Sequence, residues 1–407
     1  MKQIPWSSPS ARSCKNRRKG CNFAWEQCKL GDVCDVYDGI HHTPDYQDNG
    51  IMFLSVENIS TLTSDKFISR DFFEQNYKIF PEKGDILLTR IGNVGTPNVV
   101  ESTDKLAYYV SLALLKAPKI DSYFLCNLIC TQEFKKELHK KTLTTAIPQK
   151  INKDEIRKIT FFDSTSSDER KKIGNLLKKI NCTITLHEEK KSQLERLKST
   201  LLQKMFADKS GYPAVRFSNF GDKWKQYKLS DIGEIVTGST PPRQHPEYYS
   251  DNGVLWVTPT DITDNLISDT AKKLSVSGTR AGQVVPAGSI LVTCIASIGK
   301  NALLLTEGSF NQQINCIVPN SNKFDSYFLL TESFNWLDPM RRIAGAGTMQ
   351  IVNKNNFSKI NTFIPELEEQ IVIGNIFSKL DSLIALYKQK IEKINILKQW
   401  LLQNMFI

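Results

Sequence analysis

Two stretches of the chain, residues 166–207 and 366–407, carry the hydrophobic period of a long helix. In the second stretch, apolar residues recur in steps of four and three, interrupted only by Lys398, at Ile373, Phe377, Leu380, Ile384, Tyr387, Ile391, Ile394, Leu401 and Met405. The first stretch is more polar, with His187, Lys191 and Lys198 falling between Ile173, Leu177, Ile180, Ile184, Leu194, Leu201 and Met205. Because a helix with one apolar stripe must bury it, we expect the two helices to pair as a coiled coil.

Capping residues indicate where these helices begin. Ser166 and Glu169 have the spacing of a capping box, and Pro365 stands just ahead of the second helix. The stretches between the helices have a different pattern, with short runs of Val, Ile, Leu, Thr and aromatic residues bounded by Gly or Pro, at 84–92, 108–117, 253–262 and 289–299. These runs predict strands. Shorter helical patterns follow them at 121–140 and 325–343, so the fold class is α+β.

The chain contains two copies of one long unit. Residues 25–39 match 224–238, residues 81–95 match 286–299, and residues 147–159 match 348–360. Residues 170–206 align without gaps to 370–406 and are identical at 14 of 37 positions. The predicted segments are therefore a basic leader, a first recognition region (head 1), a first long helix, a second recognition region (head 2) and a second long helix, at 1–24, 25–165, 166–207, 208–365 and 366–407.

The net charge of +10 is concentrated in two segments. Residues 1–24 hold six basic and no acidic residues, and residues 168–206 hold ten basic and five acidic residues. The heads would therefore contact a polyanion through local patches. No apolar run is long enough to span a membrane and no signal peptide is evident, so we expect a cytoplasmic protein. The nine cysteines form no CxxC pair, which argues against a disulfide framework or a zinc site.

Motifs for catalysis are missing from the sequence. Gly299-Lys300 is followed by Asn301 and lacks the first glycine of a phosphate loop. Thr240-Pro241-Pro242 lacks the polar residue with which amino-methyltransferases hold the target amine, and no nuclease motif follows Pro44-Asp45. The five histidines fit no triad spacing. The chain itself is therefore not expected to be an enzyme, and no metal or cofactor is expected in it.

Two homologous but divergent heads on a helical rod suit a long, periodic ligand, for which duplex DNA is the natural candidate. Arg and Lys match guanine, and Asn and Gln match adenine, so we searched the loops for such side chains. The candidates in head 1 are His41, His42, Thr43, Tyr46, Gln47, Asn49, Arg90, Asn93, Gln149, Lys150 and Asn152. Those in head 2 are Thr240, Arg243, Gln244, Tyr248, Ser297, Lys300, Asn301, Gln350 and Asn353.

Three features of the chain, of which the first occurs in both copies, resemble the specificity subunit of type I restriction-modification enzymes. They are the W-x-Q-x-K-L-x-D motif at 25–32 and 224–231, the Gly-Ser-Thr-Pro-Pro run at 238–242, and the long C-terminal helix. The resemblance implies two target recognition domains that each read half of a bipartite DNA site, with the helices as an antiparallel spacer. It also implies docking of two methyltransferase subunits with S-adenosylmethionine, and through them restriction subunits that use ATP and Mg²⁺.

Other interpretations of these features stay open. The heads could bind two proteins and no DNA, which would make the chain a coiled-coil scaffold. Basic residues of the first long helix could contact phosphates, solvent or a partner subunit. Trp25 and Trp224, ahead of the first strand of each copy, are expected to be core anchors. The leader, which does not match the lead-in to the second copy at 213–224, is expected to contribute only nonspecific attraction to phosphates.

Overall fold

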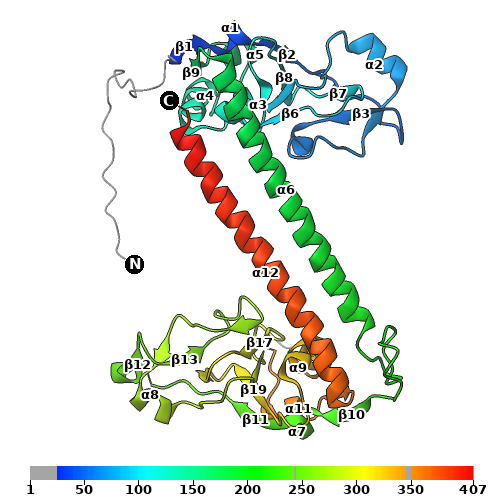
Figure 1. The fold of residues 1–407 in the computed structure, drawn as a ribbon, viewed down its shortest axis with the longest axis vertical. Coiled ribbons are helices and arrows are strands. Elements are labelled where there is room, and N and C mark those ends of the chain that lie inside the picture. The colour runs from blue at the N-terminus through cyan, green and yellow to red at the C-terminus, as the bar shows by residue number, and fades with distance from the viewer. Residues whose placement is uncertain (1–24, 243, 345–349, 407) are drawn as a thin grey trace. The chain divides into compact units, whose positions relative to one another are not determined.

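The computed structural model describes residues 25–242, 244–344 and 350–406 (Figure 1). The basic leader, residues 1–24, therefore lies outside the described residues. The chain forms two compact units. Unit 1 extends to residue 187 and also includes 390–407, whereas unit 2 comprises 188–389. Each unit thus contains one head and a segment of each long helix.

Head 1 is built on two small sheets. A four-stranded antiparallel sheet has the order β2-β8-β5-β6, and a three-stranded sheet has the order β4-β3-β7. A separate two-stranded sheet pairs β1 with β9. The strands are β1 (Trp25–Lys29), β2 (Asp35–Asp38), β3 (Ile51–Leu54), β4 (Phe67–Ile68), β5 (Ile86–Thr89), β6 (Pro97–Val99), β7 (Leu106–Tyr108), β8 (Leu112–Lys116) and β9 (Thr160–Ser164). The helices are α1 (Leu30–Val33), η1 (Val56–Asn58), α2 (Arg70–Asn76), α3 (Ser122–Ile129), α4 (Gln132–Lys141) and α5 (Lys153–Arg157).

Head 2 follows the same plan with a larger main sheet of order β11-β19-β16-β17-β14, beside a sheet of order β12-β15-β13-β18 and the pair β10-β20. The strands are β10 (Lys225–Lys228), β11 (Gly233–Thr237), β12 (Tyr249–Ser250), β13 (Val254–Val257), β14 (Leu266–Ile267), β15 (Lys273–Leu274), β16 (Ile290–Thr293), β17 (Asn301–Leu304), β18 (Gly308–Phe310), β19 (Ile314–Pro319) and β20 (Asn361–Ile364). The helices are α7 (Leu229–Ile232), η2 (Pro246–Tyr248), α8 (Val276–Ala281), α9 (Ser326–Glu332), η3 (Ser333–Trp336), α10 (Leu337–Ala344) and α11 (Lys354–Ser358).

The apolar runs form the central strands, as predicted. β5 pairs with β8 in head 1, and β16 pairs with β19 at the equivalent place in head 2. Every residue of β5 and β16 is buried, which explains why these strands are continuously apolar. The helical pattern at 121–140 is two helices, because Thr131 caps the start of α4 by accepting a hydrogen bond from the Phe134 amide.

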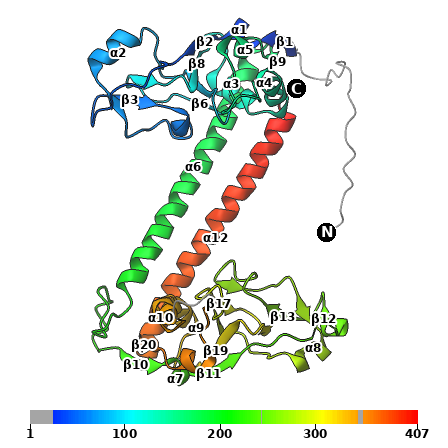
Figure 2. The same ribbon diagram turned by 180° about the vertical axis from the view of Figure 1, so that it is seen from behind.

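The long helices are α6 (Ser167–Lys204) and α12 (Leu367–Asn404), close to the predicted bounds. Burial along both follows the predicted seam. In unit 1, the end of α12 packs with the start of α6, and Leu402 and Phe406 share a core with Ile173 and Leu177. Figures 1 and 2 show this end of α12 beside α3 and the β1–β9 pair. The two segments run in opposite directions, which confirms antiparallel pairing within this unit.

Unit 2 has the reciprocal arrangement. Met205 and Phe206, just after α6, share a core with Ile373 and Phe377 near the start of α12. Phe206 contacts Trp224 and Phe328, with ring centroids 6.2 and 5.5 Å away.

The same aromatic cluster occurs in unit 1. There Phe406 contacts Trp25 and Phe124 at 6.2 and 5.3 Å. Both tryptophans are therefore core anchors, as predicted. Each head completes its core with the phenylalanine that follows the long helix of the other repeat.

Candidate nucleic-acid interface

In head 1, loops that are distant in the sequence are joined by backbone hydrogen bonds at one end of the main sheet. The Gly92 amide donates to the Gln149 carbonyl at 2.8 Å, and the Ile151 amide donates to the Arg90 carbonyl at 2.9 Å. The Arg90 amide donates to the Ser111 carbonyl at 2.9 Å. The turn at 90–95 therefore lies beside the loop at 147–152.

Head 2 joins the equivalent loops in the same way. The Ala296 amide donates to the Gln350 carbonyl at 3.2 Å, and the Val352 amide donates to the Cys294 carbonyl at 2.8 Å. The Cys294 amide in turn donates to the Gln313 carbonyl at 2.8 Å. Thr240 is hydrogen-bonded to the neighbouring Gln312. The two heads thus present the same arrangement of loops with different side chains on it.

The turns are shaped by backbone that favours glycine. Gly95 and Gly299 have φ angles of 97° and 85°, and a Cβ on either would lie within about 2.2 Å of a leucine side chain, that of Leu138 or Leu337. Head 1 has Gly92 at φ 82° where head 2 has Ala296 at φ 62°. The left-handed conformation costs an alanine about 1 kcal/mol. Head 2 therefore maintains a strained turn at this position, which is common at functional sites.

Several of the predicted side chains are exposed on or near these joined loops. In head 1 they are Asn93, Gln149, Lys150 and Asn152, whereas the exposed residues His41, His42 and Thr43 follow β2, and the centroid of the His42 ring lies 5.6 Å from that of Phe72 in α2. In head 2 they are Thr240, Ser297, Lys300, Gln350 and Asn353. Asn353 also has a local role, because its side chain accepts a hydrogen bond from the Asn356 amide and caps α11.

Two predicted residues are buried. Arg90 is 7% exposed, forms an ion pair with Asp38 and donates from Nε to the Ile151 carbonyl at 3.1 Å. Asn301 is 2% exposed and donates to the Ser333 carbonyl at 2.9 Å. In this structure both side chains hold loops together, so we leave them out of the proposed reading set. Arg243 lies outside the described residues.

The remaining predicted residues lie on outer parts of the heads. Tyr46 packs on Phe53, and the Lys66 ammonium lies 5.4 Å from the Tyr46 ring centroid. The backbone of Gln47 pairs with that of Phe67 in β4, and Asn49 follows on the same exposed segment. Tyr248 stacks on His245 in head 2 with centroids 5.0 Å apart, and Gln244 is the exposed neighbour of that histidine. These residues are therefore separate from the joined loops.

The structure adds cations that the loop search missed. Lys153, next to Asn152, lies 3.8 Å from Asp38 and is 45% exposed. Its counterpart Lys354 is also exposed, and the Asn-Lys pair occurs in both copies, which was the available signal. The last turns of α4 and α10 contribute further basic residues close to the loops in sequence, namely His139, Lys140, Lys141, Arg341 and Arg342.

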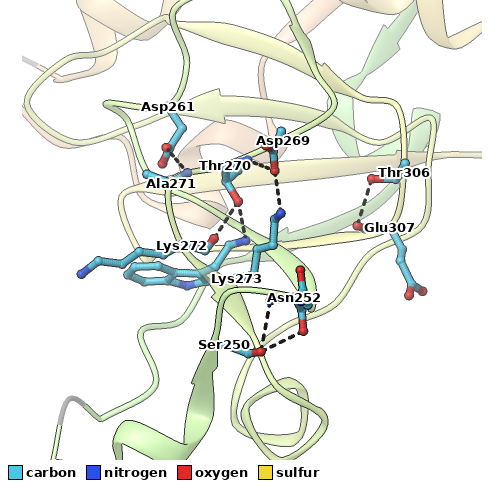
Figure 3. Close-up of polar contacts among 11 residues, drawn as sticks. Ser250, Asn252, Asp261, Asp269, Thr270, Ala271, Lys272, Lys273, Thr306 and Glu307 are labelled. Carbon is cyan, nitrogen blue, oxygen red and sulfur yellow. Dashed lines mark hydrogen bonds and ion pairs between the residues drawn. The ribbon is translucent and has the colours of Figure 1, made fainter. Parts of the chain in front are cut away.

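The outer part of head 2, here residues 249–274 around β12, β13 and β15, is held together by local polar contacts (Figure 3). Asp261 accepts a hydrogen bond from the Ala271 amide at 3.2 Å, and Thr270 donates to the Lys272 carbonyl at 2.6 Å. Figure 3 shows the Lys273 ammonium facing Asp269, at 2.9 Å, whereas that of Lys272 extends away from the group. Asp269 and Lys273 thus pair with each other, and the Lys272 ammonium lies 6.0 Å from the centroid of the Tyr249 ring.

Within residues 25–242, 244–344 and 350–406, no group of three His, Cys, Asp or Glu side chains is placed to hold a metal ion. Burial raises the pKa of the Cys294 thiol to about 11, so this cysteine beside the head 2 turn is a thiol at neutral pH. None of the helices in the described part of the chain is long and apolar enough to cross a membrane.

A second apolar stripe lies exposed on each long helix, separate from the buried seam. On α12 it comprises Leu383, Leu386, Leu397 and Trp400, which are between 42% and 57% exposed. On α6 the same positions hold Leu186 and Leu197, 63% and 47% exposed. These two leucines are identical in both copies. Exposed apolar residues that gather on a helix surface are typical of a protein interface.

Comparisons with known proteins agree with this architecture. A family model for the type I restriction modification DNA specificity domain matches residues 22–196 and 221–395. The chain is 31% identical over 149 residues to the specificity subunit of the Haemophilus influenzae type I restriction enzyme HindI, a match covering 36% of this chain and 32% of that protein. It is 26% identical over 196 residues to the MjaIX specificity subunit of Methanocaldococcus jannaschii, covering 45% and 44%.

These matches span less than half the length of the two curated relatives. Among solved structures, the chain superposes on the S subunit of a type I restriction-modification system from M. genitalium with a TM-score of 0.69. That match covers 96% of this chain and 98% of the other at 12% identity, so it supports the fold.

Proposed function

Since the chain belongs to the family of type I restriction-modification DNA specificity proteins, we propose that it is a DNA-reading subunit in which each head reads one half of a bipartite site. The observation that carries this proposal is the repeated set of joined loops. Each head holds the same loops together with the same backbone bonds, while the exposed side chains differ. Equivalent frames with different side chains suit two reading heads of different sequence preference.

The side chains at these loops have the chemistry that base reading requires. Gln149 and Asn152 in head 1, and Gln350 in head 2, carry amides that match the adenine edge, and Lys150 and Lys300 match guanine or phosphate. The neighbouring cations of α4 and α10 would bind the DNA backbone. Each head therefore combines a few specific contacts with local positive charge.

We further propose that methyltransferase subunits dock on the exposed stripes of the long helices. Two helices that share exposed leucines at two matching positions suit two copies of one partner. Adenine methylation and DNA cleavage would then lie in the partner subunits.

The reading function is tested by single-molecule methylome sequencing. One host expresses the cognate methyltransferase alone, and another expresses it with this chain. The expected result is a two-part motif with a fixed gap that is methylated only when this chain is present. If the complex assembles and methylation does not change, the alternative of a protein scaffold without DNA binding is favoured.

The docking surface is tested by co-purification. Leu397→Glu with Trp400→Glu places charges on the α12 stripe and is expected to reduce methyltransferase recovery at least tenfold, since each buried apolar side chain contributes about 2 kcal/mol. The matched control is Gln399→Glu, which adds a charge at an exposed position beside the stripe. Equal recovery with all variants would contradict docking at this surface.

A further inference from the structure

Each head is attached to its own long helix along one helical face. In unit 1 this face carries Arg170, Gly174 and Lys178, four residues apart. Arg170 donates to the Lys119 carbonyl at 3.0 Å. Gly174 lies against the start of α3, where an added Cβ would be 2.2 Å from Oδ1 of Asp121. The third residue, Lys178, donates from Nζ to the Tyr123 hydroxyl at 2.6 Å.

In unit 2 the first two contacts lie 200 residues later, whereas the third is made by Asp381, which corresponds to Asn181 and not to Lys178. Gln370 donates to the Lys323 carbonyl at 3.1 Å. A Cβ on Gly374 would be 2.5 Å from Oδ1 of Asp325, the capping residue of α9. The Tyr327 hydroxyl, equivalent to that of Tyr123, donates to Oδ2 of Asp381 at 2.9 Å. We call this three-point contact the head clamp.

The third point of the clamp differs between the units. In unit 1, Lys178 is paired with Glu101 of head 1 at 3.2 Å, and Glu101 is 55% exposed. In unit 2, Oδ1 of Asp381 accepts from Nζ of Lys198 on α6 at 2.5 Å, and both side chains are at most 21% exposed. One carboxylate therefore connects head 2, α12 and α6 in a protected ion pair.

We propose that Asp381, with Tyr327, is a positioning residue that sets which gap between the two half-sites the protein accepts. The inference rests on the proposed reading function. One base pair more or less in the gap moves a half-site by about 3.4 Å and rotates it by about a tenth of a turn. A head fixed to both long helices resists such a displacement, whereas a head that pivots on its clamp follows it.

The test uses the complete complex with methyltransferase and duplexes that carry both half-sites with the native gap or with one base pair added or removed. The dissociation constant is measured for each duplex with the wild type, Asp381→Asn and Tyr327→Phe. The matched control is Asp269→Asn, which removes a carboxylate paired with Lys273 in the outer part of the same head. Thermal unfolding of each complex shows whether a variant is folded.

Wild-type and control complexes are expected to discriminate between gaps equally. Both clamp variants are expected to reduce that discrimination by about tenfold, which corresponds to about 1.4 kcal/mol, with little change in affinity for the native gap. Unchanged discrimination, or equal weakening on all three duplexes, would overturn the role of Asp381. Failure of the wild type to bind any of the duplexes would instead refute the reading function.

Discussion

Units 1 and 2 have the same apolar framework and different polar contacts. The aromatic clusters around Phe406 and Phe206 and the glycine contacts at 174 and 374 are equivalent. The ion pairs differ between the units. The Lys198–Asp381 pair of unit 2 corresponds to Lys398 and Asn181 in unit 1, where the carboxylate is replaced by an amide. The comparison shows that packing holds the repeated frame, while charged pairs distinguish one copy from the other.

The largest effect is expected from removing Phe206 or Phe406, the two phenylalanines that each complete the core of the other repeat's head. Phe206→Ala should destabilise unit 2, and Phe406→Ala should destabilise unit 1, each by about 4 kcal/mol because a buried ring leaves a cavity. Hydrogen exchange in β5 and β16 would report each unit separately. The half-exposed Leu176→Ala serves as a control. If each substitution instead destabilised the head of its own repeat, the assignment of each phenylalanine to the core of the other repeat's head would be contradicted.

A somewhat smaller effect is expected at a buried ion pair found in unit 2. Arg216 donates from Nε and Nη2 to the two oxygens of Glu369, each at 2.7 Å, and Glu369 is 2% exposed. Arg216→Ala leaves that carboxylate buried without its cation and should cost about 3 kcal/mol in denaturant unfolding. The exposed pair Lys225–Glu366 is the control, and Lys225→Ala should change stability by less than about 0.5 kcal/mol. Equal losses would show that burial of the pair is unimportant.

A pH dependence should also distinguish the units. Glu332 is fully buried where unit 1 has Leu128, and burial raises its pKa from 4.5 to about 7. The proton is held in the folded state, so the stability is fully present below pH 4.5 and is lost as the pH rises through about 7.

Glu332→Gln, which retains a partner for the Thr362 hydroxyl, should remove this dependence. We expect it to raise the stability of unit 2 at pH 8 by about 2 kcal/mol. Chemical denaturation at pH 5 and pH 8 measures the change. A wild-type stability that does not fall between these pH values would contradict the protonated carboxyl.

The smallest effect is expected from copying the ion pair into unit 1. Lys398 and Asn181 occupy the positions of Lys198 and Asp381. Asn181→Asp should add an ion pair with Lys398 worth about 0.5 kcal/mol at low salt, and the gain should decrease as salt is added. Asn175→Asp, an exposed position on the same helix, controls for net charge. A gain that persists in high salt would point to another cause.

Much of this fold was predictable because it depends on apolar periodicity. The seam of α6 and α12, the buried strands β5 and β16, and the anchoring role of Trp25 and Trp224 all follow from apolar positions. Where the structure differs from the prediction, a competing local hydrogen bond is the reason. Thr131 interrupts one helical pattern, and the Glu169 carboxylate bonds to Ser164 although Ser166 caps the Glu169 amide as predicted.

The candidate interface was harder to predict because its polar partners are distant in the sequence. Nothing near Arg90 indicates that Asp38 will hold it, and nothing near Asn301 indicates the Ser333 carbonyl. The joined loops place Gln149 beside Gly92 only once the sheet has formed. Tyr123 and Tyr327 gave no signal of the clamp, since a tyrosine at a helix start fits an ordinary core equally well.

The central claim is that each head reads its own half-site. The most direct test is methylome sequencing with Gln149→Ala and Asn152→Ala combined in head 1, beside Lys300→Ala and Gln350→Ala combined in head 2. Each pair is expected to relax base preference in one half of the motif and to leave the other half and the gap unchanged. Both halves changing together with either pair of substitutions would contradict the account.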